Sequence, residues 1–391
     1  MKVKLSDLYD IGSSKRVFQS EWRDSGVPFY RAREIAKLSS DGTVDNELFI
    51  DEELYSEYIE KYGKPEAGDV MVTGVGTLGV CYVVKPDDRF YFKDGNILWF
   101  KQKAKDKILP EYLVKAFDSK EVKDFIDKNS SGTTVGTFTI QTAKKMEISL
   151  PSLGEQREII DKVTKIETII KQRKQDLQLL DDLIKARFVE MFGDPIKNPK
   201  GWEVVTIGDV VTEVRYGTSK PAVEGGKYPY LRMNNLTVDG HLDLNDLKYI
   251  DISDDEIEKC VVRKGDVLFN RTNSIELVGK TAVFDLSEDM VIAGYIIRVR
   301  LNERLLPEIL SQYMNLEALK DILRSMAKGA VNQANINAQE LQNIKVYVPD
   351  MELQKQFIEI KDQVNKSKVA VQKALDETQI LFDSLMQKYF G

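Results

Sequence analysis

A long internal repeat constrains the fold of this chain more than any other feature. The segment IDKVTKIETIIKQRKQDLQLLDDLIKARFVEMFG ends at Gly193, and the related segment IEIKDQVNKSKVAVQKALDETQILFDSLMQKYFG ends at Gly391, 198 positions later. Each copy follows a strand-like run that stops at proline, Met146–Pro151 and Ile344–Pro349, again 198 positions apart. A period of this length dictates the architecture. It predicts two globular units, each followed by a long helix, with pseudo-two-fold symmetry.

The repeat divides the chain into five segments. We expect a first globular unit over residues 1–150, a long helix over 151–193, a linker over 194–201, a second globular unit over 202–349 and a C-terminal long helix over 350–391. Hydrophobic residues make up 42% of the 391 residues and charged residues 30%, which is typical of a globular chain with room for two domains. The short β-branched runs in both units predict mixed α/β (α+β) domains.

Framework runs recur between the two units, whereas the polar loops between them differ. GDVMVTGVGTLGVCYVV (Gly68–Val84) aligns with GDVLFNRTNSIELVGKTAVF (Gly265–Phe284), and VPFYRAREI (Val27–Ile35) aligns with YPYLRMNNL (Tyr228–Leu236). Two copies of one ligand-binding domain that have diverged to bind different ligands would show this pattern. Divergence after a duplication without any change of ligand would show it as well. A protein with two related halves also suits a target that has two halves.

Both long helices carry apolar residues at alternating spacings of four and three, which predicts a coiled-coil seam. Ser152 and Glu155 have the spacing of a capping box at the start of the first helix. Each helix, of about 37 residues, should be about 55 Å long. We expect the two helices to pair antiparallel within one chain, and pairing between two chains is the alternative. The predicted seam comprises Ile159, Val163, Ile166, Ile170, Leu177, Leu180, Ile184, Phe357, Val364, Val371, Leu375, Phe382 and Leu385. Polar residues interrupt it at Arg173, Arg187, Lys361, Lys368 and Thr378.

Residues that carry catalytic or metal chemistry are scarce. The one histidine, His241, lies in a turn-like segment and is expected at the surface, and Cys81 and Cys260 are expected as buried free thiols. These counts allow neither a paired-cysteine nor an H-E-x-x-H metal site, so we expect no metal. Gly74–Gly79 matches G-x-G-x-x-G, but a β-branched run follows where a dinucleotide site needs a helix. This segment therefore predicts a tight hairpin-like turn.

The charge balance restricts the partners. The formal net charge is −7, which argues against a simple nucleic-acid-binding surface, so any DNA contact must come from local patches or from a partner protein. No run approaches the roughly 18 consecutive apolar residues of a membrane span. The N-terminal segment MKVKLSDLYD has no apolar core of signal-peptide length. We therefore expect a cytoplasmic protein with no membrane contact.

Three polar loops in the second unit contain side chains that read DNA bases. They are VRYGTSKP (Val214–Pro221), NRTNS (Asn270–Ser274) and VNQANIN (Val331–Asn337). Arginine pairs with guanine O6 and N7, asparagine and glutamine pair with adenine N6 and N7, and hydroxyls bind phosphate. Asparagine-rich loops are also common as plain turns. The predicted DNA-binding residues of this unit are Arg215, Tyr216, Ser219, Lys220, Arg232, Asn234, Asn270, Arg271, Thr272, Asn273, Asn332, Gln333 and Asn335.

These features together resemble the specificity subunit of type I restriction-modification systems. The resemblance covers essentially the whole chain and is carried by GDVLFNRTNSIELVGKTAVF, by FGDPIKNPKGWEVVTIGDV after the first helix, and by the helix openings LPSLGEQREII and VPDMELQKQFI. It implies that residues 1–150 and 202–349 are target recognition domains of mixed α/β structure. It also implies that the two helices form a spacer that sets the gap between the two half-sites of a split DNA sequence.

The resemblance further implies a reader without catalysis of its own. Double-stranded DNA and two methyltransferase subunits are the expected partners, and two restriction subunits can join them. S-adenosylmethionine, ATP and Mg are expected on those partner subunits and not on this chain. The expected surface for the methyltransferase includes Lys171, Lys174, Gln175 and Gln178, which lie off the seam; a solvated helix face is the alternative.

The first recognition domain departs from the pattern at one place. Where the second has NRTNS, the first has TGVGT (Thr73–Thr77), with neither arginine nor asparagine. We therefore expect other polar residues to bind DNA there: Ser13, Ser14, Lys15, Arg31, Arg33, Thr133, Thr134 and Thr137. Two other classes of function stay open, a stand-alone DNA-binding regulator and a coiled-coil scaffold that binds proteins only.

Overall fold

The computed structural model describes residues 2–130, 136–330 and 333–391. Both halves of the chain contain helices and strands, as the predicted mixed α/β class requires. Among these residues, no helix combines the length and the apolar character needed to cross a membrane. Cys81 and Cys260 are free thiols, and both are buried, as predicted.

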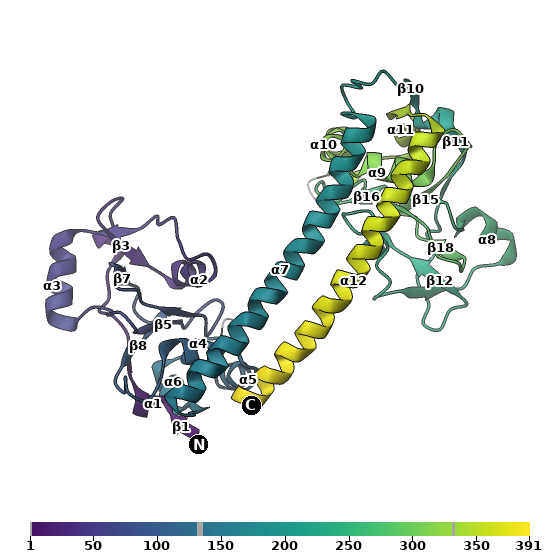
Figure 1. Ribbon diagram of the computed structural model, residues 1–391. Helices are drawn as coiled ribbons and strands as arrows, with labels where there is room; N and C mark the ends of the chain where they lie inside the picture. The colour runs from purple at the N-terminus through teal and green to yellow at the C-terminus, as the bar shows by residue number, and fades with distance from the viewer. Residues whose placement is uncertain (1, 131–135, 331–332) are drawn as a thin grey trace. The chain divides into compact units, whose positions relative to one another are not determined.

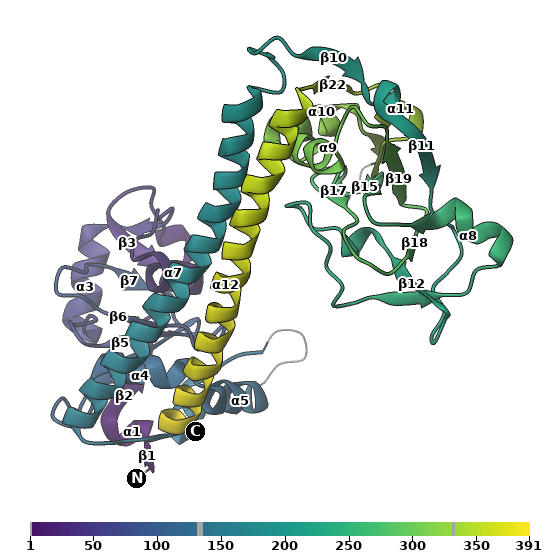
Figure 2. The ribbon, with the colours of Figure 1, turned by 45° about the vertical axis from the view of Figure 1, so that its right-hand side comes forward.

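Two long helices run through the chain, α7 (Leu153–Phe192) and α12 (Met351–Phe390). Each has 40 residues, which corresponds to about 60 Å. The chain forms two compact units: unit 1 consists of Met1–Arg173 and Ala374–Gly391, and unit 2 consists of Lys174–Lys373. In each unit a half of α7 lies beside a half of α12 and runs antiparallel to it (Figures 1 and 2). The predicted antiparallel pairing within one chain is therefore confirmed.

The α/β domain of unit 1 is built from short strands and helices. Its elements are β1 (Lys2–Lys4), α1 (Leu5–Leu8), β2 (Tyr9–Gly12), η1 (Gln19–Glu21), β3 (Val27–Tyr30), α2 (Ala32–Asp41), β4 (Phe49–Ile50), α3 (Glu52–Tyr62), β5 (Val70–Thr73), β6 (Cys81–Val83), β7 (Tyr91–Phe92), β8 (Ile97–Gln102), α4 (Pro110–Asp118), α5 (Lys120–Asn129), α6 (Ile140–Lys145) and β9 (Glu147–Ser149).

The α/β domain of unit 2 repeats this order with additions. Its elements are β10 (Glu203–Thr206), η2 (Ile207–Val210), β11 (Val211–Tyr216), β12 (Tyr228–Leu231), η3 (Met233–Asn235), β13 (Lys248–Ile250), α8 (Asp254–Cys260), β14 (Val261–Val262), β15 (Val267–Asn270), β16 (Thr272–Asn273), β17 (Thr281–Val283), β18 (Met290–Ile292), β19 (Ile296–Leu301), α9 (Pro307–Met314), α10 (Glu317–Met326), β20 (Lys328–Ala330), β21 (Gln333–Asn335), α11 (Ala338–Gln342) and β22 (Lys345–Val348).

The two domains share their sheet topology. Unit 1 has an antiparallel sheet in the order β2-β8-β5-β6, and unit 2 has the corresponding sheet β11-β19-β15-β17. A short parallel pair recurs as β3 with β7 and as β12 with β18. The GVGTLG segment is the turn between the antiparallel strands β5 and β6, so the predicted hairpin-like turn is confirmed and no helix follows it.

The apolar core of each domain continues into its pair of helix segments. In unit 1 the cluster that contains Tyr112 also contains Val163 and Phe390, and the rings of Tyr112 and Phe390 lie 5.1 Å apart. In unit 2, Phe188 packs edge-on against Phe357 with ring centroids 5.2 Å apart. Each domain is therefore fixed to its own helix segments by a shared core.

The predicted seam is confirmed in part. Seven of its residues are buried: Ile159, Val163, Ile170, Ile184, Phe357, Val364 and Leu375. The other six are half-buried: Ile166, Leu177, Leu180, Val371, Phe382 and Leu385. The spacing did not predict four other buried residues of the two helices, which are more deeply buried than these six half-buried seam residues: Phe188, Phe192, Met386 and Phe390. They lie near helix ends, where the helices pack against a domain as well as against each other, so the buried face is wider than a two-helix seam.

Polar residues that interrupt the seam bind across it. In unit 1, the Arg173 guanidinium donates to the Thr378 hydroxyl and to the Ala374 carbonyl. In unit 2, the Lys368 ammonium pairs with the Asp181 carboxylate. These polar contacts fix the register of the two helix segments, because a slip of either helix would leave partly buried charges unpaired.

Helix starts and stops follow local chemistry. The Ser152 hydroxyl accepts a hydrogen bond from the Glu155 N–H at 3.4 Å, and the Glu155 carboxylate accepts one from the Ser152 N–H at 2.8 Å, which confirms the capping box. α7 ends at Phe192, and Gly193 follows with φ +88°, a conformation that favours glycine.

Two buried glutamines anchor the helix starts. Gln156 on α7 accepts from the Leu109 N–H and donates to the carbonyls of Lys107 and Pro151. Gln354 on α12, 198 positions later, makes the same three bonds to Leu306, Arg304 and Pro349. Both side chains are 0% exposed. The repeat therefore extends from sequence to individual hydrogen bonds.

Candidate nucleic-acid interface

Arg271 lies where two strands of unit 2 meet. It follows β15 and precedes β16, and β16 pairs with β21. Its N–H donates to the Tyr295 carbonyl and its carbonyl accepts from the Ile336 N–H, both at 2.9 Å. The backbone is therefore held on both sides, and the side chain leaves from a fixed point.

The Arg271 side chain rests on an aromatic ring. Its guanidinium carbon lies 5.0 Å from the centroid of the Tyr216 ring, and one terminal nitrogen donates to the Gly294 carbonyl at 3.3 Å. Its Nε is buried, and among the residues described by the structure it has no hydrogen-bond partner and no carboxylate pairs with the guanidinium. A pre-oriented arginine whose donors are not used by an acid is suited to bidentate contact with guanine or phosphate.

Two exposed tyrosines contact this arginine, Tyr216 through its ring and Tyr295 through its backbone carbonyl. Tyr216 is 44% exposed, and its hydroxyl accepts from the Ala338 N–H at 2.8 Å. Tyr295, whose carbonyl binds Arg271, is 48% exposed. Arg215 is exposed beside Tyr216 and pairs with Glu213 at 3.1 Å. We name Arg215, Tyr216, Arg271 and Tyr295 the Arg271 cluster.

Other residues of the NRTNS loop hold the loop together. Asn270 is 0% exposed; its amide donates to the carbonyls of Thr272 and Tyr295 and its oxygen accepts from Asn273. The Thr272 hydroxyl, also buried, donates to the Asn335 side chain at 2.8 Å. The polar atoms of Asn270 and Thr272 are thus used inside the protein, and their contact with bases stays a prediction. Asn273 and Asn335 are half-buried and share these bonds.

The remaining candidates of unit 2 differ in availability. Lys220 pairs with Glu256, and Arg232 pairs with Asp246 at 2.7 Å. Ser219 and Asn234 are exposed. Asn332 lies outside the described residues, as does the side chain of Gln333. The DNA contacts of all these residues stay predictions.

A cationic groove in unit 1 brings together residues from separate segments. It has a volume of about 610 Å³, and Arg31, Arg33 and Lys37 line it together with Thr77 and Asn96. Thr77 belongs to the glycine-rich turn, so the turn faces the two arginines that the sequence predicted as DNA contacts. Lys37 and Asn96 were missed, because nothing in their local sequence indicates that they share this groove.

Both arginines of this groove already have acidic partners. Arg31 and Arg33 each bind the buried Glu34 carboxylate, at 2.8 and 2.9 Å, and Arg33 binds Glu47 at 2.7 Å. Burial alone would raise the pKa of Glu34, but the hydrogen bonds from Arg31 and Arg33 lower it to about 2. A phosphate contact by these arginines would have to compete with Glu34 and Glu47.

The hydroxyl candidates of unit 1 are mostly structural. The Ser13 hydroxyl donates to the Ile97 carbonyl at 2.9 Å, and the Ser14 hydroxyl donates to the Phe92 carbonyl at 2.6 Å. These bonds argue against the expectation that Ser13 and Ser14 face DNA. Lys15 is exposed, with its ammonium 5.8 Å from the Tyr62 ring centroid. Thr137 is half-buried, and Thr133 and Thr134 lie outside the described residues.

One group of side chains among the described residues has the composition of a metal site, although we expected none. Asp181, Asp239 and His241 place their ligating atoms within 4.8 Å of one another. The local sequence around His241 gave no signal, because Asp181 lies on α7, far from it along the chain.

The fold and these surfaces define a class: a duplicated protein in which each α/β domain packs on antiparallel helix segments and presents cationic and aromatic side chains. The sequence model of the type I restriction modification DNA specificity domain matches residues 1–179 and again 199–378, and the chain belongs to this family. The two matches correspond to the two repeats.

Individual proteins are similar over parts of the chain. The MjaX specificity subunit of a type I restriction enzyme from Methanocaldococcus jannaschii is 29% identical over 49% of this chain and 46% of its own length. The EcoKI specificity subunit of a type I restriction enzyme from Escherichia coli K12 is 22% identical over 68% of this chain and 61% of its own length. The chain thus spans about half the length of the curated relatives it matches.

A solved structure shows the same fold. It comes from work on complex assembly and conformational transition of the type I R-M system, and it overlays on the whole chain and on 97% of its own chain with a TM-score of 0.63 at 21% identity.

Proposed function

We propose that this chain is the DNA specificity subunit of a type I restriction-modification complex. Each recognition domain reads one half of a split DNA sequence, and the helix pair sets the distance between the halves. The observation that carries this proposal is the double match to the DNA specificity domain, one match in each repeat. A duplicated reader needs a target with two halves.

Base reading in the second domain depends on the Arg271 cluster. Its central arginine is fixed by backbone bonds, stacked on Tyr216 and free of an acidic partner among the described residues. In the first domain the groove lined by Arg31, Lys37 and Asn96 is the corresponding candidate. The difference between these surfaces supports two half-sites of different sequence.

The helices also offer protein-binding surface. Leu179 and Leu183, one helical turn apart on α7, are 57% and 43% exposed, next to the exposed polar residues Lys174, Gln175 and Gln178. Exposed apolar residues rimmed by polar ones mark protein contacts. We assign this face of α7, together with Lys171, to a methyltransferase subunit.

Catalysis belongs to partner subunits under this proposal. Two methyltransferase subunits modify adenine with S-adenosylmethionine, and two restriction subunits that use ATP and Mg can join. Much of the cationic surface that encloses DNA would come from these partners, which is consistent with the net charge of −7.

The test is to co-express the chain with its methyltransferase and to map modified adenines by single-molecule sequencing. The proposal predicts a two-part target with a fixed unspecified spacer. Removing one heptad from each helix should shorten that spacer. Modification without a two-part target, or a spacer unchanged in a folded and active deletion variant, would contradict it.

A substitution separates base reading from general DNA affinity. Arg271→Ala should weaken modification by about 5- to 150-fold, equivalent to about 1–3 kcal/mol, and should relax specificity at one position of one half-site. Arg263→Ala is the matched control, because Arg263 is half-buried in the same unit but is paired with Glu258 and Asp289. It should leave the target unchanged.

A further inference from the structure

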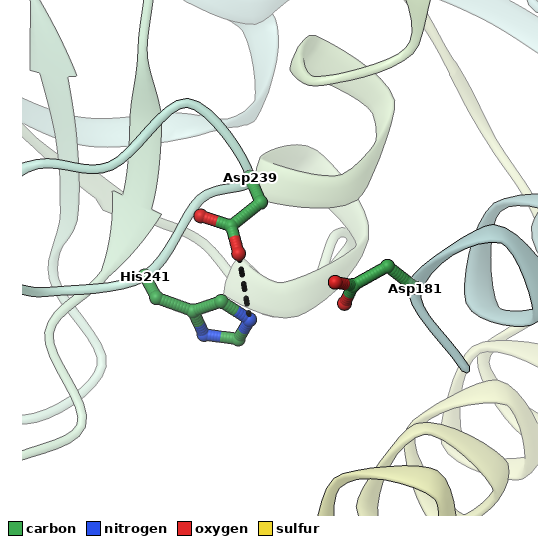
Figure 3. Close-up of side chains that lie close together, drawn as sticks. All are labelled: Asp181, Asp239 and His241. Carbon is green, nitrogen blue, oxygen red and sulfur yellow. Dashed lines mark ion pairs between the residues drawn. The ribbon is translucent and has the colours of Figure 1, made fainter. Parts of the chain in front are cut away.

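Three potential metal ligands converge in unit 2, away from the Arg271 cluster. Asp239 and His241 lie in the turn between η3 and β13, and Asp181 lies on α7. Figure 3 shows the three side chains pointing toward a common space. The His241 Nε2 and the Asp239 Oδ2 are 3.9 Å apart, and one ligating atom from each of the three residues falls within 4.8 Å of the others.

The turn that carries two of the ligands is held rigidly. The Thr237 hydroxyl accepts from the His241 N–H at 2.9 Å and donates to the His241 carbonyl at 3.0 Å. Gly240, between the two ligands, has φ +86°, and a Cβ there would lie 2.5 Å from the Asn315 side-chain nitrogen and 2.9 Å from the Thr281 carbonyl oxygen. The turn is thus pressed onto the domain, and Asp239 and His241 are presented together toward α7.

Asp181 has an oxygen left for a ligand, and the site has room. The Lys368 ammonium binds only the Oδ1 of Asp181. Asp181 and Asp239 both line a cavity of about 330 Å³, together with the cationic residues Lys185, Lys280, Lys320 and Arg324 and the acidic residues Glu276 and Glu317. Lys368 and Lys361 on α12 also lie near His241. Lys368 pairs with Asp181 through Oδ1, so Oδ2 is left for a divalent ion.

The donor set fits a borderline divalent cation. One imidazole nitrogen and two carboxylates are ligands that zinc accepts, with water completing the shell. In a tetrahedral site with bonds of about 2.0–2.1 Å, the ligand atoms lie about 3.4 Å from one another. The distances between the ligating atoms, now 3.9 Å to within 4.8 Å, would therefore have to shorten by about 0.5–1.4 Å through rotation of the aspartate side chains.

We propose that Asp181, Asp239 and His241 form a binding site for one divalent transition-metal ion of the zinc class. The ion joins α7 to the recognition domain of unit 2 and fixes the turn between η3 and β13. The site is specific to this half of the repeat. The α12 position 198 residues after Asp181 is Gln379, and the Asp41-Gly42 pair of the first domain is followed by Thr43.

The single histidine makes the test sharp. The full chain, free of any polyhistidine tag and stripped with a chelator, is titrated with Zn²⁺, Co²⁺ and Mg²⁺ by calorimetry. We expect one Zn²⁺ per chain, a visible Co²⁺ spectrum with imidazole coordination, and much weaker binding of Mg²⁺, which prefers oxygen ligands. His241→Ala and Asp239→Asn should each weaken Zn²⁺ binding at least about tenfold.

Asp182→Asn is the matched control, because Asp182 neighbours Asp181 on α7 but is exposed and outside the cluster. It should bind Zn²⁺ as the unsubstituted chain does. Equal affinity for Mg²⁺ and Zn²⁺, or Zn²⁺ binding unchanged by His241→Ala, would overturn the site. If that variant fails to fold, modification of the unsubstituted chain with diethyl pyrocarbonate tests the site instead. Bound Zn²⁺ should protect the one imidazole from the reagent, and full reactivity of His241 at saturating Zn²⁺ would refute the proposal.

Discussion

Replacement of Gln354 by leucine should weaken unit 2 and leave unit 1 unchanged. The side chain is 0% exposed and makes three hydrogen bonds at the start of α12, to the Leu306 N–H at 2.9 Å and to the carbonyls of Arg304 and Pro349 at 3.0 and 2.8 Å. Leucine has a similar size but none of these polar atoms, so the change removes the bonds with little loss of volume.

The magnitude follows from the groups left without partners. Arg304 is exposed, so its carbonyl can turn to water, whereas Pro349 is buried and Leu306 half-buried. A buried polar group without a partner costs about 1–3 kcal/mol, so two of them cost about 2–6 kcal/mol. Leucine gains about 1 kcal/mol from its extra apolar surface. The net loss in the free energy of unfolding of unit 2 should be about 1–5 kcal/mol.

Urea unfolding combined with hydrogen exchange measures this effect unit by unit. Gln354→Leu should speed exchange at the starts of α9 and α12, and Gln156→Leu should do the same at the starts of α4 and α7. Gln175→Leu, on an exposed face of α7, is the control and should change stability by less than about 0.5 kcal/mol. A loss below about 1 kcal/mol for Gln354→Leu, or equal loosening of both units, would refute the anchor role.

Three further predictions concern charged groups. Burial lowers the pKa of Lys320 to about 8, below its unfolded value of 10.5. The free energy of unfolding should therefore rise by about 3 kcal/mol between pH 8 and pH 10.5, because the unfolded chain binds the proton more tightly. The Lys320→Met variant should lack this rise when unfolding is measured as a function of pH. For Glu34 the pH dependence has the opposite sign, because its pKa of about 2 lies below the usual 4.5. Its charged form should stabilise the folded state by about 2–3 kcal/mol above pH 4.5, and this stabilisation should be lost as the pH falls toward 2. A Glu34→Gln variant whose stability falls with acid in the same way would contradict this. Arg173→Met should destabilise the helix pair of unit 1 by about 1–3 kcal/mol in thermal unfolding, because the hydrogen bonds from the guanidinium to the Thr378 hydroxyl and the Ala374 carbonyl are lost; no change would show that these bonds do not stabilise the helix pair.

The sequence predicted the features that depend on spacing and local chemistry. The 198-residue period located both long helices, the Ser152–Glu155 spacing gave the capping box, and Gly193 marked the end of α7. The run after Gly74–Gly79 was enough to distinguish a hairpin from a nucleotide site. Each of these depends on residues that are neighbours along the chain.

The sequence could not predict which polar side chains are used inside the protein. Asn270 and Arg271 are adjacent in the same polar segment. The Asn270 side chain is nevertheless buried and bonded to the Tyr295 carbonyl, whereas the Arg271 guanidinium lies over the Tyr216 ring without an acidic partner among the described residues. Likewise, Asp181 and His241 approach each other only because the domain packs on α7. Such contacts join residues far apart in sequence, and no local pattern encodes them.

The most direct test of the central claim is to give one chain the same recognition domain twice. Residues 202–349 are replaced by a second copy of residues 1–150, the chimera is expressed with the methyltransferase, and modified adenines are mapped. If each domain reads one half-site, both halves of the new target should be copies of the sequence that unit 1 reads, with the spacer kept. A target that retains the original second half, in a chimera that folds and supports modification, would contradict the account.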